Sequence, residues 1–96
     1  MNTNAITVKY SDEKLRILVE EYITMQKHEF TFKGLCSYVL YWAKEEGKTA
    51  EISLYASDKI DNSDCNRLMC VLERIVQDGR IERVSKDKTR FIKKEK

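Results

Sequence analysis

The chain has 96 residues, of which 42% are hydrophobic and 35% are charged. This length allows one domain with one modest core, and the composition excludes a disordered chain. No apolar run approaches the roughly 18 residues that span a bilayer. Residues 1–8 also lack the charged and apolar segments of a secretory signal. We therefore expect a single domain over residues 1–96, cytoplasmic and without a membrane partner.

The net charge of +2 conceals an asymmetry along the chain. Residues 79–96 hold eight basic and three acidic residues, a net charge of +5. Residues 1–78 hold ten basic and thirteen acidic residues, a net charge of −3. Concentrated positive charge attracts phosphate backbones, so the basic C-terminal segment is the first indication of a nucleic-acid partner.

The sequence offers little for metal or catalytic chemistry. Cys36, Cys65, Cys70 and the single histidine, His28, do not have the spacing of a zinc ligand set. We expect reduced thiols that pack as small apolar side chains, and no cofactor. The three glycines are isolated, which excludes a phosphate-binding loop, and no Gly-rich turn supports a cysteine nucleophile. We expect no enzymatic activity.

The first predicted helix follows a polar segment. Residues 1–10 predict a flexible lead-in. Ser11 then occupies an N-cap position, and Asp12 and Glu13 follow in the first turn, where carboxylates complement the helix dipole. Apolar residues at helical spacing extend this helix to about residue 27; they are Leu15, Leu18, Val19, Tyr22 and Ile23.

A short alternating segment precedes the second predicted helix. Residues 29–32 fit either a strand of two or three residues or an approach in which Thr31 caps the next helix. Residues 33–46 predict that helix, and Gly47 ends it. Its expected core stripe contains Leu35, Tyr38, Val39, Trp42 and Ala43. Aromatic side chains at this spacing are more often core than ligand platform.

Residues 48–62 are ambiguous. Ile52, Leu54 and Ala56 alternate as in a strand, but a short helix capped by Thr49 fits as well, and we favour the helix. Residues 58–62 have the composition of a turn in either case.

The third predicted helix is capped by Ser63 or Asp64 and ends at Gly79. Its expected buried stripe is Leu68, Val71, Leu72, Ile75 and Val76, and its opposite face presents Asn66, Cys70, Glu73 and Gln77. Residues 80–84 and 89–93 then predict a hairpin with a four-residue loop. Ile81 and Val84 fall on opposite faces of an ideal strand, so burying both requires a bulge or a hairpin covered on both sides.

Residues 67–84 (RLMCVLERIVQDGRIERV) resemble the winged helix-turn-helix family, in which a recognition helix runs directly into the first strand of the wing. Gly79 fits this junction because it can adopt the left-handed conformation that turns the chain sharply. The resemblance implies an α+β winged-helix fold: three to four helices followed by a C-terminal two-stranded hairpin wing at 80–93. Residues 48–62 exceed the usual turn, so either 33–46 or 50–57 could be the helix that precedes the recognition helix.

The resemblance further implies that helix 63–78 enters the major groove of double-stranded DNA while the wing contacts the backbone or the minor groove. Asn66 and Arg67 would then reach base edges, and Arg74 would meet phosphate. The predicted contacts of the basic segment are Arg83, Lys86, Lys88, Arg90 and Lys93. Glu73, and the acidic residues Asp58, Asp61 and Asp64 before or at the helix start, oppose this function because they repel phosphate.

Two functions are therefore expected to compete. The first is a DNA-binding transcriptional regulator or accessory factor. The second is an adaptor or dimerisation module that binds protein rather than DNA. An exposed apolar strip of Ile17, Met25, Leu40 and Tyr41 would mark such a surface. A homodimer suits both functions, and helix 11–27 is its expected interface.

Overall fold

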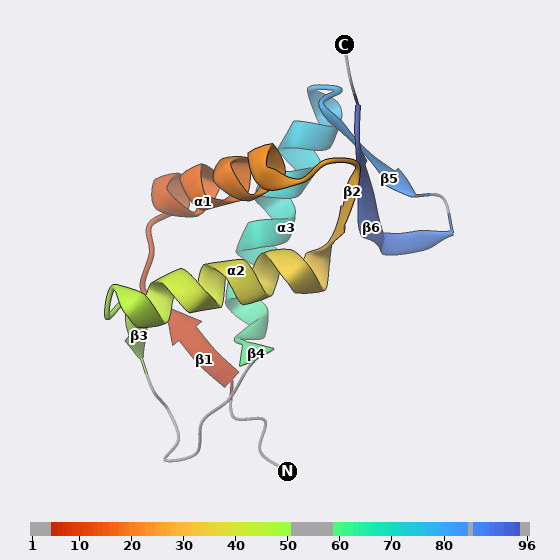
Figure 1. The fold of residues 1–96 in the computed structure, drawn as a ribbon. Helices are drawn as coiled ribbons and strands as arrows, with labels where there is room; N and C mark the ends of the chain where they lie inside the picture. Colours follow the sequence, from red (N-terminus) through yellow and green to blue (C-terminus); the bar gives the residue numbers. More distant parts are fainter. Residues whose placement is uncertain (1–4, 51–58, 85, 95–96) are drawn as a thin grey trace.

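The computed structural model describes residues 5–50, 59–84 and 86–94 and has an α+β architecture with three helices (Figure 1). In chain order the elements are β1 (Ala5–Val8), α1 (Asp12–Met25), β2 (Glu29–Thr31), α2 (Phe32–Glu45), β3 (Thr49–Ala50), β4 (Lys59–Ile60), α3 (Asn62–Gln77), β5 (Ile81–Val84) and β6 (Asp87–Lys93). None of the described helices has the length and apolar character needed to cross a membrane.

The strands form two small sheets at opposite ends of the helices (Figure 1). One sheet has the order β2-β6-β5, and all its pairings are antiparallel. The other has the order β3-β1-β4, with β1 antiparallel to β3 and parallel to β4. The predicted hairpin is therefore present, but it is two strands of a three-stranded sheet rather than a separate two-stranded unit. Its second strand begins at Asp87 rather than Thr89, so the expected four-residue loop is wrong.

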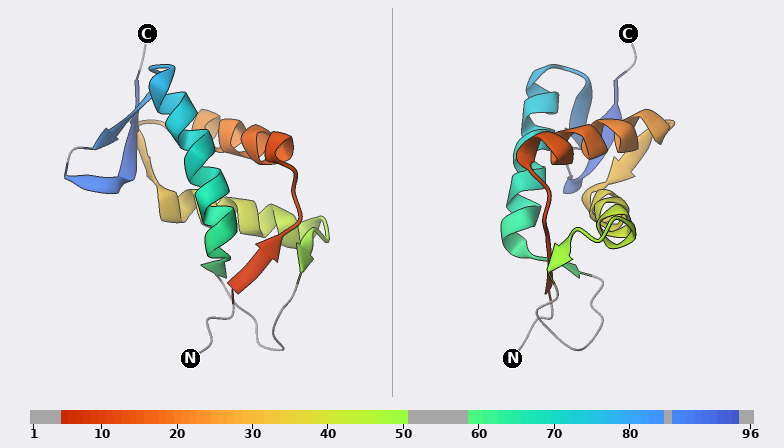
Figure 2. Two further views of the ribbon diagram at one scale, coloured as in Figure 1. Left: turned by 180° about the vertical axis from the view of Figure 1, so that it is seen from behind. Right: turned by 90° about the vertical axis from the view of Figure 1, so that its left-hand side faces the viewer.

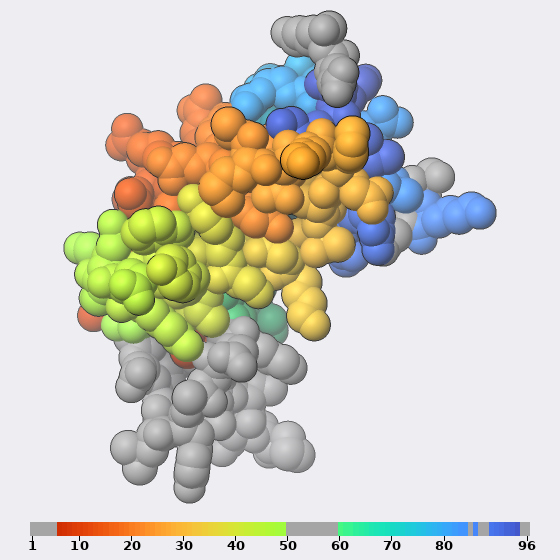
Figure 3. Space-filling view, viewed as in Figure 1, coloured from red at the N-terminus to blue at the C-terminus, as the bar shows by residue number. Residues whose placement is uncertain are grey.

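The core lies between the three helices and the β2-β6-β5 sheet. Its fully buried side chains include Leu15, Val19, Leu35, Val39, Leu68, Leu72, Ile81 and Phe91. Phe30 of β2 stacks on Phe91 of the neighbouring strand β6 with ring centroids 5.4 Å apart, and Tyr22 of α1 packs edge-on against Phe30 at 5.7 Å, which joins the sheet to the helix. In Figure 3, α1 and α2 cover one face of the molecule and the hairpin protrudes beside them.

The N-terminal segment differs from the flexible lead-in that we expected. Within it, Ala5–Val8 forms the central strand of the β3-β1-β4 sheet. Ile6 and Val8 are buried, and the Val8 amide donates to the Asp64 carboxylate at 3.0 Å. The alternation of these two apolar residues is too short to be recognised without its pairing partners, which lie more than 40 residues away.

The first two helices begin as predicted. The Ser11 hydroxyl accepts from the Lys14 amide, and the Thr31 hydroxyl accepts from the Gly34 amide. Thr31 also pairs with Arg90 in the β2–β6 ladder, so both interpretations of residues 29–32 hold.

The buried stripe of α1 is confirmed, but that of α2 is rotated from the prediction. Leu35, Val39 and Ala43 are buried as expected, and Leu40 replaces the aromatic residues. Trp42 is 37% exposed and stacks edge-on against Tyr41. Because α2 packs against α1 and also against β4, its buried face is not the one that α1 alone would select.

Residues 48–62 contain two strands where we expected a helix start and a turn. Thr49 lies in β3 opposite Val8, so it does not cap a helix. Lys59 and Ile60 form β4 instead of belonging to a turn. Most of the favoured short helix falls on residues 51–58, which lie outside the described residues.

The start of α3 also differs from the prediction. Asp61, rather than Ser63 or Asp64, occupies the N-cap position, and it makes no capping hydrogen bond through its side chain. Asp64 lies within the first turn of α3 and is buried.

The end of α3 follows the sequence closely. Gly79 has φ +80°, and the Arg80 amide donates to the Ile75 carbonyl across the turn. The hairpin has an irregularity between Arg83 and Val84, as anticipated from the positions of its apolar residues. Ile81 and Phe91 are buried, whereas Ile92 is 41% exposed.

Candidate nucleic-acid interface

The outer face of α3 is the surface on which the sequence places DNA contacts. Seen from behind, α3 lies at the surface with the β5–β6 hairpin on one side and α1 on the other (Figure 2). Its exposed residues are Asn62, Ser63, Asn66, Cys70, Arg74 and Gln77. Asn66, Cys70 and Arg74 follow each other at intervals of four, so they form one stripe along the helix.

Arg67 lies beside this stripe, but its guanidinium is used inside the fold. It bonds the Asp64 carboxylate at 2.9 Å, the Tyr10 carbonyl at 2.5 Å and the Asp12 carboxylate at 2.8 Å. Asp64 is 2% exposed, and its second oxygen accepts from the Val8 amide. Arg67 thus ties α3 to the segment between β1 and α1, and it cannot reach a base edge without giving up these bonds.

Arg83 is likewise committed to the fold. It bonds the Glu73 carboxylate of α3 at 2.5 Å, and its guanidinium lies over the Phe91 ring, 5.5 Å from the centroid. This ion pair neutralises Glu73, the residue whose charge most opposed DNA binding at the centre of the helix. Among the described residues, the Arg83 Nε is a buried donor without an acceptor.

Two further predicted contacts from the basic segment bond to neighbouring elements. Arg90 pairs with Glu29 of the adjacent strand at 2.7 Å. The Lys93 ammonium donates to the Gln26 carbonyl at 2.9 Å. The side chain of Lys88 lies outside the described residues, although its backbone belongs to β6.

Three of the eight predicted contacts remain available to a partner. Asn66 and Arg74 are exposed on α3, and Lys86 is exposed in the β5–β6 turn. None of the three side chains makes a hydrogen bond or ion pair to a residue that the structure describes. The candidate interface is therefore smaller than the sequence predicts: it consists of the α3 stripe and the β5–β6 turn.

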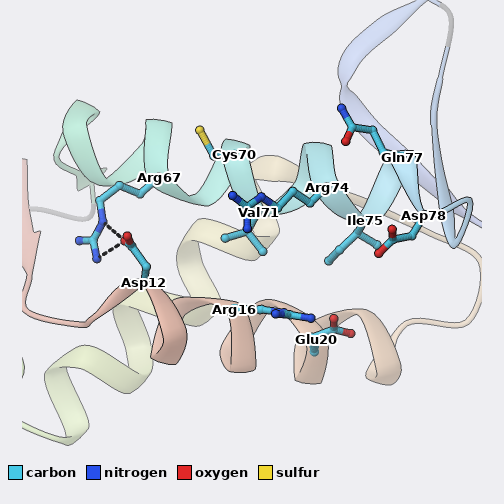
Figure 4. Close-up of a pocket in the computed structure, with 10 residues that line it drawn as sticks. All are labelled: Asp12, Arg16, Glu20, Arg67, Cys70, Val71, Arg74, Ile75, Gln77 and Asp78. Atoms are coloured by element: carbon cyan, nitrogen blue, oxygen red, sulfur yellow. Dashed lines mark hydrogen bonds and ion pairs between the residues drawn. The ribbon is translucent and has the colours of Figure 1, made fainter.

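A groove of about 540 Å³ separates α3 from α1 along this face (Figure 4). Its lining contains the buried Ile75 and the half-buried Val71. Arg16 of α1 and Arg74 of α3 both line it, on the two facing helices, with Arg16 beside Glu20 and Arg74 beside Val71 in Figure 4. The sequence did not indicate Arg16, because its place across the groove from α3 depends on how the two helices pack.

The acidic residues of the groove are mostly neutralised by arginines. Asp12 pairs with Arg67, and Glu20 makes two hydrogen bonds to Arg80, one of them at 2.8 Å. The Arg80 hydrogen bonds lower the pKa of Glu20 below its ordinary value against an opposing effect of burial, and the charge of Arg16 lowers it further. Glu20 is therefore a firmly ionised partner of Arg80 at neutral pH.

Two of the three cysteines are partly packed as expected, and the third, Cys70, is not. Cys36 of α2 and Cys65 of α3 are half-buried neighbours, whereas Cys70 is exposed. Burial and the proximity of Cys65 raise the pKa of Cys36 to about 12. No group of three or more metal-ligating side chains occurs among the described residues.

A separate exposed apolar surface bears on the adaptor alternative. Ile17, Met25 and Tyr41 are 45%, 58% and 56% exposed. Leu40, which we expected in the same strip, is 5% exposed and belongs to the core. The exposed aromatic pair is instead Tyr41 and Trp42, with ring centroids 5.4 Å apart.

Comparison with protein-family models, curated proteins and solved structures finds no match to the chain.

Proposed function

We propose that this protein is a winged-helix domain that binds duplex DNA through the outer face of α3 and the β5–β6 turn, as a transcriptional regulator or accessory factor. The element order α1-β2-α2-α3-β5-β6 and the sheet order β2-β6-β5 support this assignment, because they attach the hairpin to the helices through β2. The β3-β1-β4 sheet is an addition at the far end of α3.

The observation that carries the proposal is the unpartnered polar stripe on α3. Asn66 and Arg74 lie eight residues apart, about 12 Å along the helix axis, which matches three to four base-pair steps. An asparagine can pair with adenine, and an arginine can bind either guanine or phosphate. Lys86 in the turn beside the helix supplies a further phosphate contact.

The affinity expected from this surface is modest. Arg67, Arg83, Arg90 and Lys93 bond within the fold, so few cations are left for counterion release. Non-specific binding should have a dissociation constant of about 10⁻⁶ to 10⁻⁴ M at physiological salt.

Fluorescence anisotropy with a labelled random duplex tests the proposal. We expect wild-type binding to weaken about tenfold between about 50 and 200 mM salt, because two phosphate contacts give a slope of about −1.8. Replacing Arg74 and Lys86 together by alanine should reduce the slope of log K against log salt by about 1.8, because each phosphate contact contributes about 0.9. Alanine at Lys44 and Lys48, both exposed and outside the α3 face, provides the matched control. Equal effects of the two double variants would place the interface elsewhere.

The adaptor alternative is supported by a different observation. Tyr41 and Trp42 expose an aromatic pair at the end of α2, whereas an isolated globular domain usually buries tryptophan. Under this alternative, wild-type protein would not bind duplex at any salt concentration, and Trp42 fluorescence would shift when a protein partner is added.

A homodimer through α1 remains part of the proposal. Ile17 and Met25 are exposed on this helix, and two copies would multiply a weak affinity for DNA. Light scattering after size-exclusion chromatography should give twice the monomer mass for wild type and the monomer mass for Ile17→Glu. A monomer for both proteins would exclude the dimer.

A further inference from the structure

Two guanidinium groups in the groove between α1 and α3 have no partner among the described residues. Arg16 and Arg74 line it, and both are exposed. Neither makes a hydrogen bond or ion pair to any residue that the structure describes. Most of the other charged residues in the groove are paired, as described above, so these two carry the charge that a ligand would meet.

The remaining acid in the groove is Asp78, which caps the C-terminus of α3. It lies one turn beyond Arg74 and makes no ion pair with it. Three arginines and three carboxylates line the groove, so its formal charge is zero, and the positive charge open to a ligand is that of the two unpaired guanidinium groups. The charge of Arg16 contributes to the lowered pKa of Glu20, one turn further along α1, so Arg16 lies near this carboxylate.

Two arginines on separate helices suit a phosphate group. A guanidinium donates two parallel hydrogen bonds to a tetrahedral oxyanion, and phosphate has enough oxygens to accept from two such groups at once. The Val71 and Ile75 side chains beneath them provide an apolar surface for the sugar or carbon body that carries the phosphate. A lone carboxylate would use only one of the two arginines fully.

We propose that Arg16 and Arg74 bind one phosphate group between them in the groove between α1 and α3. The phosphate can come from the DNA backbone, which rests on the proposed function, or from a free phosphate compound, which does not. If the phosphate belongs to DNA, Arg16 extends the DNA interface from α3 onto α1. If it belongs to a free compound, the groove is a ligand site next to the recognition surface.

Two titrations of the same proteins distinguish these sources. The first follows the arginine side-chain NH signals by NMR while inorganic phosphate replaces chloride at constant ionic strength. The second measures duplex affinity by anisotropy. The variants are Arg16→Gln and Arg74→Gln, with Lys44→Gln as the control because it removes one exposed charge outside the groove. Unfolding in urea verifies that each variant is folded.

For a backbone phosphate, Arg16→Gln and Arg74→Gln should each weaken duplex binding about eightfold at 0.1 M salt and reduce the salt slope by about 0.9. Lys44→Gln should leave both unchanged. For a free phosphate, inorganic phosphate should shift the Arg16 and Arg74 signals together, and Arg16→Gln should abolish the shift at Arg74.

The proposal is overturned if Arg16→Gln matches the control in both titrations. Failure of the proposed function gives a different result. Wild type would then not bind duplex, while inorganic phosphate would still shift the Arg16 and Arg74 signals if the groove binds phosphate.

Discussion

Replacing Arg67 by alanine should lower the stability of the protein, whereas replacing Arg74 by alanine should not. The comparison distinguishes an arginine that stabilises the fold from one that is free to bind a partner. Arg67 and Arg74 lie on the same helix, two turns apart, and sequence alone assigns both to DNA. In the structure Arg67 bonds Asp64, Asp12 and the Tyr10 carbonyl, whereas Arg74 has no partner among the described residues. Arg74→Ala is therefore a control of the same residue type in the same helix.

The magnitude follows from the exposure of the partners. The Asp64 side chain is 3% exposed, and breaking a buried ion pair by removing one partner costs about 3–5 kcal/mol. Arg67 is itself 32% exposed, so water entering its place reduces the cost, and Asp64 keeps the Val8 amide as a donor. The Asp12 pair adds at most about 1 kcal/mol because Asp12 is 86% exposed. We expect Arg67→Ala to lower the free energy of unfolding by about 2–3 kcal/mol.

Urea unfolding followed by circular dichroism measures this difference. A denaturant slope of about 1–3 kcal/mol/M converts the expected loss into a midpoint shift of about 0.7–3 M. Arg74→Ala should stay within about 0.5 kcal/mol of wild type, since it changes an exposed helix position. Equal midpoints for the two variants would refute the assignment of Arg67 to the fold.

Three further outcomes are expected. Leu72→Ala should destabilise the protein by about 2–5 kcal/mol in the same urea assay, because Leu72 is fully buried on α3; a loss near zero would mean that this face of α3 is not core. Arg80 lowers the pKa of Glu20, so the stability that this pair contributes is complete above the ordinary pKa of 4.5 and disappears as the pH falls through the lowered value. The difference in unfolding free energy between wild type and Glu20→Gln should accordingly be largest above pH 4.5 and shrink in acid, and a difference that grows in acid would contradict the pairing. Burial raises the pKa of Cys36 to about 12, so iodoacetamide at neutral pH should label the exposed Cys70 before Cys36. Mass spectrometry of the labelled peptides measures the order, and faster labelling of Cys36 would contradict the prediction.

Local patterns in the sequence predict the elements whose causes are local. The apolar spacing of α1, its Ser11 cap and the left-handed Gly79 after α3 all depend on residues within a turn or two of each other. The hairpin irregularity near Arg83 follows in the same way from which apolar residues must point inward. These features could be derived before any contact between distant segments was known.

The errors concern contacts between segments far apart in the chain. The strand β1 exists because Thr7 and Val8 pair with Ala50 and Thr49, and because Asp64 accepts from Val8. The rotation of the α2 core stripe, which buries Leu40 and exposes Trp42, likewise depends on elements packed against α2 from elsewhere in the chain.

The candidate site shows the same division. Exposure of Asn66, Cys70 and Gln77 follows from helical periodicity alone. Helical periodicity does not predict that Arg83 pairs with Glu73, or that Arg16 and Arg74 line the same groove. Each of these arrangements joins two elements, and the sequence pattern does not determine how those elements pack. The number of basic residues in the sequence therefore overestimates the number of basic side chains that are available to bind DNA.

An NMR titration of the ¹⁵N-labelled protein with a short random duplex at low salt tests the proposed DNA interface most directly. We predict that the amide signals of Asn66, Arg74, Gln77 and Lys86 shift together and that the shifts vanish as salt is added. We also predict that the signals of Tyr41 and Trp42 do not move. Shifts confined to Tyr41 and Trp42, or no shifts at all, would contradict the proposed interface.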